Sequence, residues 1–355
     1  MNISSTLTVD LGDRSYPIVI GDGLLGDFDI GAHLAGPDCV IVSNDTVGPL
    51  YLDSLRRSLP DAAAVISLPD GEAHKTLQNA TAILDQLIAN HASRDATIVA
   101  LGGGVVGDIS GFAAACYMRG IAFIQVPTTL LAQVDSSVGG KTGVNHAQGK
   151  NLIGAFHQPR LVLIDTDTLT TLPDRELKAG LAEIIKYGVI ADIDFFTWLE
   201  DNMSALLARD REALVYAIRR SCELKAEVVA ADEREAGRRA ILNYGHTFGH
   251  AIENSLGYGE WLHGEAVAVG MLLAAELSGL DAEVRMRLQK LVELAGLPAV
   301  PPAVGAAKMR AAMDMDKKVA AKQLRFVLLN SLGGAFVTSD YDPDLLAKIL
   351  EQTNS

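Results

Sequence analysis

Residues Thr97–Asp108 read TIVALGGGVVGD, and this stretch decides the fold of the first half of the chain. A β-rich apolar run leads into three glycines, and a helical segment follows. Gly102, Gly104 and Gly107 have the spacing of a dinucleotide fingerprint, in the strand-to-helix context that the motif requires. Glycine lets the backbone approach a pyrophosphate, and the helix N-terminus supplies aligned N–H groups. A tight turn that packs a helix on a sheet is the alternative interpretation.

The sequence around this loop predicts an α/β domain with a mostly parallel, Rossmann-like sheet. Alternating runs at 6–9 and 16–20 predict an opening hairpin. Further strands, with helices between several of them, are predicted at 39–42, 64–68, 97–101, 121–126 and 161–164. Strands that alternate with helices indicate a parallel sheet, whose ligands gather at the carboxyl ends of the strands. One feature departs from the ordinary Rossmann pattern, because the strand after the loop runs into Pro127-Thr128-Thr129 and does not end on an acidic residue.

The second half of the chain is dominated by helical patterns. They follow a shift in composition near Leu172 and cover 175–187, 194–207, 211–231, 247–255, 264–277 and 282–295. A chain of 355 residues also exceeds the usual size of one domain. We therefore expect an α/β domain over residues 1–172 and an all-α domain over residues 173–355.

Composition excludes several classes of partner. The net charge of −14 argues against nucleic acid and anionic membranes, and an anionic substrate would need a local basic pocket. The apolar run 266–275 is flanked by Glu265 and Glu276, which predicts a buried helix rather than a membrane span. The three cysteines are far apart in apolar or helical contexts, and the first residues lack a signal-peptide pattern. These features predict a cytoplasmic protein with reduced thiols.

Two polar segments of the first domain are candidates for binding anions. In the segment Asp70–Lys75, Glu72 could accept hydrogen bonds from ribose hydroxyls and Lys75 could pair with a phosphate, although a charged surface turn is the alternative. The segment 134–151 is rich in small and polar residues and carries Lys141 and Lys150. Its GGKT resembles the end of a P-loop, but the leading glycine is absent, so we reject that motif. The two lysines either face anionic groups or are ordinary surface lysines.

A carboxylate and three histidines in the second domain form a candidate metal site. His246 and His250 are four residues apart at the start of a predicted helix, hence on one face. His263 follows two glycines that let the chain turn back, and Glu183 lies on an earlier helix with Lys186 one turn away. Such groups can hold a Zn²⁺-like ion with an open position, although spacing alone does not say whether both His246 and His250 are ligands. A metal site and a dinucleotide site together suggest redox chemistry at a carbinol.

These motifs together resemble the 3-dehydroquinate synthase family over nearly the whole chain. The resemblance rests on the segments GEAHK (71–75), GGGVVGD (102–108), PTTLLAQVDSSVGGK (127–141), GKNLIG (149–154), AEIIK (182–186), LNYGHTFGH (242–250) and HGE (263–265). It implies a dehydroquinate synthase-like fold, with an NAD⁺-binding α/β domain followed by a helical domain. Two positions depart from the family pattern, because Asn44 stands where aspartate is frequent and His157 where an aromatic residue is frequent.

The resemblance also assigns roles to residues. It implies that Zn²⁺ or Co²⁺ is bound by Glu183, His246 and His263. NAD⁺ contacts are implied for Asn44, Asp70, Gly71, Glu72, Lys75, Gly104, Val105, Val106, Gly107, Asp108, Thr128, Thr129, Lys141, Lys150, Thr168, Leu169, Thr170 and Thr171. Substrate contacts are implied for Asp135, Lys141, Asn151, Lys186, Lys225, Arg239, Asn243, His250 and either Lys317 or Lys318. Arg119 is implied to reach the phosphate site of a second subunit, which predicts a homodimer.

The activity implied by the resemblance is a cyclisation with loss of phosphate. The family substrate is the anionic sugar phosphate 3-deoxy-D-arabino-heptulosonate 7-phosphate, and the product is 3-dehydroquinate. The implied order is oxidation, phosphate elimination, return of the hydride and an aldol closure, so NAD⁺ is regenerated. Alternatives are another sugar phosphate cyclase of inosose or valiolone type, a metal-dependent polyol dehydrogenase, or a non-catalytic dinucleotide sensor.

Overall fold

The computed structural model describes residues 1–59, 64–257, 259–319 and 324–354, with side chains described outside 315–319. Contacts within the chain divide it into two compact units, which we describe separately. Unit 1 comprises residues 1–172 and 214–234, and unit 2 comprises residues 173–213 and 235–355. Helix α6 (Arg211–Ala231) therefore belongs mostly with the first unit, although it follows two helices of the second.

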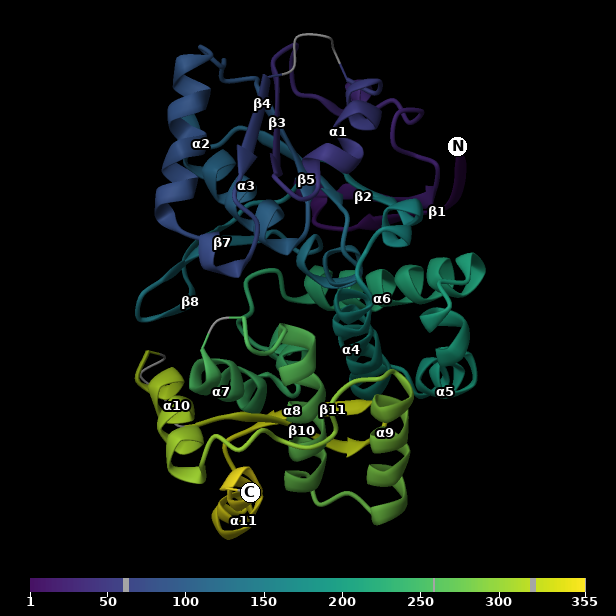
Figure 1. Ribbon diagram of the computed structural model, residues 1–355, viewed down its shortest axis with the longest axis vertical. Coiled ribbons are helices and arrows are strands. Elements are labelled where there is room, and N and C mark those ends of the chain that lie inside the picture. Colours follow the sequence, from purple (N-terminus) through teal and green to yellow (C-terminus); the bar gives the residue numbers. More distant parts are fainter. Residues whose placement is uncertain (60–63, 258, 320–323, 355) are drawn as a thin grey trace. The chain divides into compact units, whose positions relative to one another are not determined.

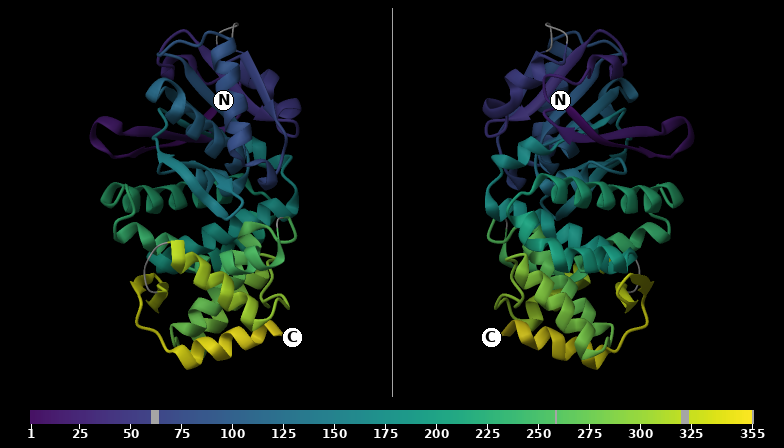
Figure 2. Two further views of the ribbon diagram at one scale, coloured as in Figure 1. Left: turned by 90° about the vertical axis from the view of Figure 1, so that its left-hand side faces the viewer. Right: turned by 90° about the vertical axis from the view of Figure 1, so that its right-hand side faces the viewer.

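Unit 1 is built on a seven-stranded sheet in the order β1-β2-β9-β6-β5-β3-β4. Its strands are β1 (Asn2–Val9), β2 (Tyr16–Asp22), β3 (Cys39–Asn44), β4 (Ala64–Leu68), β5 (Thr97–Gly102), β6 (Ala122–Pro127) and β9 (Val162–Asp165). Only the β1–β2 pair is antiparallel among the described strands of this sheet, which confirms the predicted opening hairpin and parallel sheet. The hairpin projects from the rest of the unit in both views of Figure 2, and most of β1 is exposed or half-buried.

Helices cover both faces of this sheet, because alternate residues of the central strands point in opposite directions. Val40 and Ile98 join an apolar cluster with α2 (Leu77–Ala89) and α3 (Gly104–Cys116), whereas the next residues, Ile41 and Val99, join a cluster with α1 (Gly48–Arg56). Figure 1 shows these helices beside the sheet. A separate antiparallel ribbon, β7 (Lys141–His146) and β8 (Gly149–Phe156), packs on α3.

Unit 2 is helical, as predicted, and adds one antiparallel strand pair. Its helices are α4 (Asp174–Ala191), α5 (Ile193–Leu207), α7 (His246–Leu256), α8 (His263–Leu277), α9 (Ala282–Leu294), α10 (Ala306–Val319) and α11 (Pro343–Glu351). The pair β10 (Phe326–Ser331) and β11 (Gly334–Thr338) was not predicted. It forms because the apolar start of β10 is buried against α8 and Gly333, at φ 80°, allows the tight turn.

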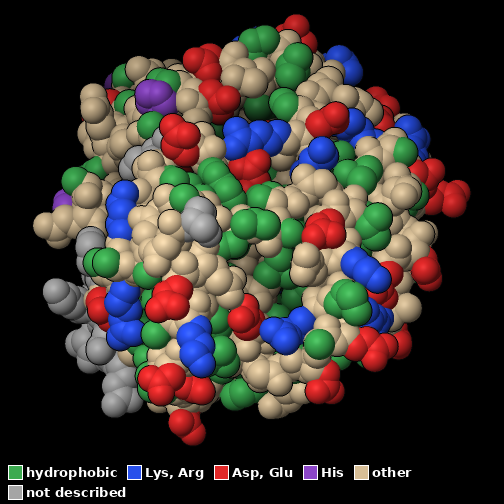
Figure 3. Space-filling view, turned by 60° about the horizontal axis from the view of Figure 1, so that its bottom comes forward, with side chains coloured by type: hydrophobic (Ala, Val, Ile, Leu, Met, Phe, Trp, Pro, Cys, Tyr) green, Lys and Arg blue, Asp and Glu red, His purple; other side chains and the backbone are tan. Residues whose placement is uncertain are grey.

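Helix α8 lies at the centre of unit 2 and packs on α4, α7 and α9. Its segment 266–275 is almost entirely buried, which confirms the predicted buried helix. Among the described residues, no helix combines the length and apolarity needed to cross a bilayer. On the face drawn in Figure 3, acidic and basic side chains are interspersed, so the net charge of −14 does not form a single acidic patch there.

Candidate active-site residues

Two glycines on α8 bring the predicted metal ligands together. A Cβ on Gly264 would lie 2.0 Å from the carbonyl oxygen of Ala179, one turn before Glu183 on α4. A Cβ on Gly270 would lie 2.1 Å from the carbonyl oxygen of Gly245, the residue before His246. Both approaches are possible only without a side chain. Because α4 and α7 can approach α8 this closely, the starts of α7 and α8 meet at the middle of α4.

Glu183, His246 and His263 converge, as the sequence predicted. One ligand atom from each residue lies within 4.8 Å of the others. The Nε2 atoms of His246 and His263 lie 3.7 Å and 3.5 Å from the same carboxylate oxygen, Oε1 of Glu183. One carboxylate oxygen and two imidazole nitrogens are the donor set of a catalytic zinc or cobalt site that leaves a coordination position for substrate. The residues therefore fit a divalent transition metal.

The other ring nitrogen of each ligand histidine also has a polar neighbour. Nδ1 of His246 lies 3.1 Å from the carbonyl oxygen of Tyr244, and Nδ1 of His263 lies 3.5 Å from Oε1 of Glu253. An acceptor beside Nδ1 favours the tautomer that keeps its proton there and leaves the lone pair of Nε2 available to a metal. The sequence analysis did not single out Glu253. Its signal is the spacing 246, 250, 253, which places three polar groups on one face of α7.

The two ligand histidines differ in charge environment. Burial and the nearby Lys186 ammonium lower the pKa of His246 to about 3, which favours the neutral form that binds metals. Burial also opposes charge on His263, but the Glu183 and Glu253 carboxylates outweigh it and raise the pKa of His263 to about 10. Two carboxylates on either side of the His263 ring favour a positive charge between them. A proton on the ring or a divalent cation at Nε2 can supply that charge.

The remaining predicted residues of unit 2 have different surroundings. Lys186 forms an ion pair with Glu183 and is 1% exposed. The ring of His250 lies 5.4 Å from that of His246 and 6.0 Å from that of His263. Arg239 is buried, and Asn243 donates a hydrogen bond of 2.9 Å to Glu235. Lys317 and Lys318 lie in α10, outside the residues whose side chains the structure describes.

In unit 1, the glycine loop forms the predicted strand-to-helix turn. Strand β5 ends at Gly102, Gly103 caps α3, and α3 begins at Gly104. A Cβ on Gly104 would lie 2.9 Å from Oγ of Ser136, and a Cβ on Gly103 would lie 3.1 Å from Cγ2 of Thr129. The absence of side chains at Gly103 and Gly104 thus lets Thr129 and Ser136 lie against the start of α3. The N–H groups of a helix N-terminus suit anion binding. Val105 to Gly107 form the first turn of α3.

A polar network in unit 1 joins several of the predicted cofactor and substrate residues. The Lys75 ammonium lies 2.5 Å from Asp108 Oδ2 and donates to Asn151 Oδ1 at 2.6 Å. Although burial works against its charge, the Asp108 carboxylate raises the pKa of Lys75. Asn145 extends the network, since it donates to Glu72 at 2.8 Å and accepts from the Asn151 N–H at 2.9 Å. Asn145 lies in the polar segment 134–151, and the sequence predicted no role for it.

Other predicted cofactor contacts of unit 1 form separate small groups. Asn44 donates to Asp70 at 2.7 Å, beside Gly71 at φ 104°. The Tyr51 hydroxyl donates to the Thr168 carbonyl at 3.1 Å and contacts the Thr171 hydroxyl. Leu169 and Thr170 share that turn, Thr166–Thr170, while Thr128 follows β6 and donates its N–H to the Gly102 carbonyl at 3.0 Å.

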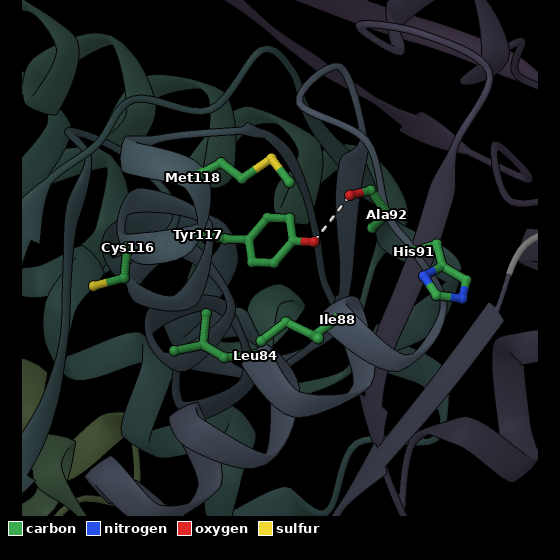
Figure 4. A pocket seen from close by; sticks show the side chains of 7 residues that line it. All are labelled: Leu84, Ile88, His91, Ala92, Cys116, Tyr117 and Met118. Atoms are coloured by element: carbon green, nitrogen blue, oxygen red, sulfur yellow. Dashed lines mark hydrogen bonds between the residues drawn. The ribbon is translucent and has the colours of Figure 1, made fainter.

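The predicted lysines and arginine of unit 1 differ in their surroundings. Lys225, on α6, lies 2.6 Å from Oδ1 of Asp135, so these two predicted substrate contacts are paired with each other. Lys141 and Lys150 lie on the β7–β8 ribbon, where Lys141 is exposed and Lys150 half-buried. Arg119 is exposed in a turn with φ 72°. It follows Met118 in the chain, and Met118 lines the hollow drawn in Figure 4. That hollow has a volume of about 620 Å³ and is lined by Leu84, Ile88, His91, Ala92, Cys116, Tyr117 and Met118.

Comparison with known protein families adds an independent finding. A model described as 3-dehydroquinate synthase N-terminal matches residues 65–179, and one described as 3-dehydroquinate synthase C-terminal matches residues 180–319. The chain belongs to the 3-dehydroquinate synthase family. The predicted resemblance is therefore confirmed.

Curated relatives within this family are similar over nearly their full length. The 3-dehydroquinate synthase of Nitrosococcus oceani is 60% identical over 354 residues, which are 98% of this chain and 99% of that protein. The 3-dehydroquinate synthase of Teredinibacter turnerae is 58% identical over 353 residues, 97% of this chain and 98% of that protein.

Solved structures of sugar phosphate cyclases have the same fold. A 2-deoxy-scyllo-inosose synthase complexed with carbaglucose-6-phosphate, NAD⁺ and Co²⁺ is 29% identical, with a TM-score of 0.88 and coverage of 98% of this chain and 99% of that one. A 2-epi-5-epi-valiolone synthase from Streptomyces hygroscopicus with NAD⁺ and Zn²⁺ bound is also 29% identical, with a TM-score of 0.89 and 99% coverage of both chains. A glycerol dehydrogenase from Schizosaccharomyces pombe, at 18% identity and a TM-score of 0.66 over 95% of this chain and 88% of that one, shares the fold alone. The predicted dehydroquinate synthase-like fold is confirmed.

Proposed function

We propose that this protein converts 3-deoxy-D-arabino-heptulosonate 7-phosphate into 3-dehydroquinate and phosphate. The observation that carries the proposal is the near-full-length similarity, at 60% and 58% identity, to two proteins named 3-dehydroquinate synthase. The cluster of Glu183, His246 and His263 supports it, because a redox cyclase of this family needs a metal site with an open position. The inosose and valiolone synthases are only 29% identical, about half the value for those two relatives, which favours the heptulosonate phosphate as substrate.

The cofactors we propose are NAD⁺ and a divalent metal, Zn²⁺ or Co²⁺. NAD⁺ would be held by the glycine loop, Asn44, the segment 70–75, Thr128, Thr129, Lys141, Lys150 and the turn 168–171. Glu183, His246 and His263 would hold the metal. When bound, these groups would supply hydride transfer and the polarisation of substrate hydroxyls. Both cyclases named above contain NAD⁺ with Co²⁺ or Zn²⁺, and this supports the assignment.

The chain's own residues would bind and orient the anionic substrate. Lys186, Lys225 and Arg239 are buried cations that would give the site a local positive field in a protein of net charge −14. His250 lies beside the ligand histidines, where it can hold or release a proton. The other proposed substrate contacts are Asp135, Lys141, Asn151, Asn243 and Lys317. We assign NAD⁺ binding to residues 1–172, and metal binding with most substrate contacts to residues 173–355.

We also propose a cytoplasmic homodimer in which Arg119 acts in the partner's site. The three cysteines are unpaired, which suits a reducing compartment. Arg119 is exposed in a positive-φ turn beside an apolar hollow, so it is available to a second copy. Mixing Arg119→Ala with Glu183→Ala subunits tests this: hybrid dimers should regain activity, because one site receives an intact Arg119 and keeps its metal. No recovery in verified hybrid dimers would contradict the shared site.

The function is tested by phosphate release from the heptulosonate phosphate with substoichiometric NAD⁺. We expect many turnovers per NAD⁺, loss of turnover with a chelator, recovery with Co²⁺ or Zn²⁺, and no net rise in NADH absorbance. Steady NADH accumulation with a polyol would instead indicate a dehydrogenase. Faster phosphate release from glucose 6-phosphate or sedoheptulose 7-phosphate would indicate another cyclase of the superfamily.

A further inference from the structure

We propose that Glu253 is a positioning residue for His263, holding the Nδ1 side of the ring so that Nε2 stays directed at Glu183. The inference rests on the proposed function only in taking Glu183, His246 and His263 as the metal ligands. Glu253 itself would not touch the metal. It would act through His263 and set how tightly, and in what geometry, the metal is held.

The placement of Glu253 is the first argument. It lies on α7, seven residues after His246, and therefore on the same face of the helix two turns later. Its side chain is 5% exposed, although a buried carboxylate is costly unless it has a polar or charged partner. His263, at the start of α8, presents Nδ1 to it at 3.5 Å. The carboxylate is thus buried where it faces a predicted metal ligand.

The orientation of the His263 ring is the second argument. Nε2 lies 3.5 Å from Glu183 Oε1 on α4, while Nδ1 lies 3.5 Å from Glu253 Oε1 on α7. The two nitrogens of one ring therefore face carboxylates from two different helices. A carboxylate at Nδ1 fixes the tautomer and ring orientation of a metal-ligating histidine and increases its basicity. Without it, the ring could rotate or move its proton to Nε2, and either change would weaken the ligand.

A comparison with His246 shows why Glu253 matters at this position. His246 is anchored through Nδ1 by the backbone carbonyl of Tyr244, at 3.1 Å, and its side chain is 11% exposed. The side chain of His263 is 32% exposed, so packing restrains it less. Its anchor is a side chain that a substitution can remove, whereas the anchor of His246 is part of the main chain. His246 can therefore serve as the reference histidine whose anchor stays in place when Glu253 is substituted.

A second cation site is the competing interpretation of the same residues. His250, Glu253 and His263 also place one ligand atom each within 4.8 Å of one another. In that arrangement His263 would use one of its nitrogens for the second cation. The two interpretations predict different metal stoichiometries, one equivalent for a positioning role and two for a second site.

The test is a cobalt titration of the full-length protein, which does not depend on turnover. Glu253→Gln and Glu253→Ala are compared with the parent protein by competition with a chromophoric chelator and by the visible Co²⁺ spectrum. We expect affinity to fall by about 10- to 100-fold in Glu253→Ala and by less in Glu253→Gln, whose amide oxygen can still accept from Nδ1. The spectrum should change in both. The control is Glu276→Gln. Glu276 is a carboxylate on α8 that accepts a hydrogen bond from Gln352, and its substitution should leave the cobalt affinity and spectrum unchanged.

A double-mutant cycle separates positioning from a general effect on folding. If Glu253 acts through His263, Glu253→Gln should not weaken cobalt binding further in a His263→Ala background. Additive losses, unchanged affinity in a folded Glu253→Gln variant, or two bound equivalents in the parent protein would each overturn the proposal. Failure of the parent protein to bind cobalt would overturn the metal assignment and this inference together. Failure to release phosphate from the heptulosonate phosphate would overturn only the substrate assignment.

Discussion

The two units hold their buried charges in different ways. In unit 1, Lys75 pairs with Asp108 and Lys225 with Asp135, so each carboxylate has an ammonium from the chain itself. In unit 2, Glu183 and Glu253 both face the imidazole of His263, and Glu183 also pairs with Lys186. These two pairs of unit 1 are therefore balanced without a bound cation, whereas the cluster in unit 2 becomes more favourable when a cation joins it. Substitutions of these residues in unit 2 should therefore affect mainly metal binding. Substitutions of the paired residues in unit 1 should affect mainly NAD⁺ binding or stability.

Removal of Glu183 should have the largest effect on activity, and it should separate metal binding in unit 2 from NAD⁺ binding in unit 1. Glu183→Ala deletes the carboxylate that both Nε2 atoms face, so bound metal and turnover should fall to background. NAD⁺ affinity should stay within about threefold of the parent protein, because the glycine loop belongs to unit 1. Metal content and NAD⁺ titration measure the two effects. The control is Glu293→Ala, which removes an exposed carboxylate on α9. Substantial activity in metal-free Glu183→Ala would refute the assignment of Glu183 as a metal ligand.

Lys75→Met tests whether the charges of unit 1 are balanced by the chain. The change leaves the Asp108 carboxylate, whose side chain is 18% exposed, without its ammonium, and such a loss costs on the order of 1–3 kcal/mol. Urea unfolding should show this loss, and NAD⁺ affinity should fall while cobalt affinity stays unchanged. Adding Asp108→Asn should recover part of the stability, since the unpaired charge is removed. A single variant as stable as the parent protein would contradict the argument.

The same contrast explains what could be predicted from the sequence. The glycine loop is contiguous, so the β-rich apolar run of β5 and the glycine spacing predicted both its structure and its place before a helix. Glu183 lies about 60 and 80 positions before the two histidines, and residue spacing left the ligand set open. The family resemblance completed the set. Gly264 and Gly270, which bring the three helices together, were not recognised, because glycine in a helical pattern does not reveal which backbone approaches it. Asn145 was missed for the same reason, since Glu72, which it contacts, comes from a distant segment. Glu253 was missed although His263 follows only ten positions later, because the spacing does not show that the ends of two successive helices meet.

Gly264→Ala tests the close helix approach that assembles the metal cluster. The new methyl group would lie 2.0 Å from the Ala179 carbonyl oxygen, so α4 and α8 must separate. Overpacking of this kind costs about 1–3 kcal/mol, and here it also moves His263 away from Glu183. We expect a lower melting temperature together with weaker cobalt binding and unchanged NAD⁺ binding. Gly48→Ala is the matched control, because the nearest atom to its Cβ is 3.7 Å away; equal effects of both variants would exclude the steric explanation.

Tyr51→Phe should have the smallest effect, a modest loss of NAD⁺ affinity that is confined to unit 1. The variant removes the hydroxyl that donates to the Thr168 carbonyl and contacts the Thr171 hydroxyl, in the turn proposed to bind NAD⁺. One such hydrogen bond contributes about 1 kcal/mol, which corresponds to a several-fold weaker affinity if it orders the binding turn. Isothermal titration should show this change for NAD⁺ and none for cobalt. Tyr341→Phe in unit 2 is the control. An effect on cobalt binding as large as that on NAD⁺ would show that the two regions are coupled, contrary to the separation argued from their charges.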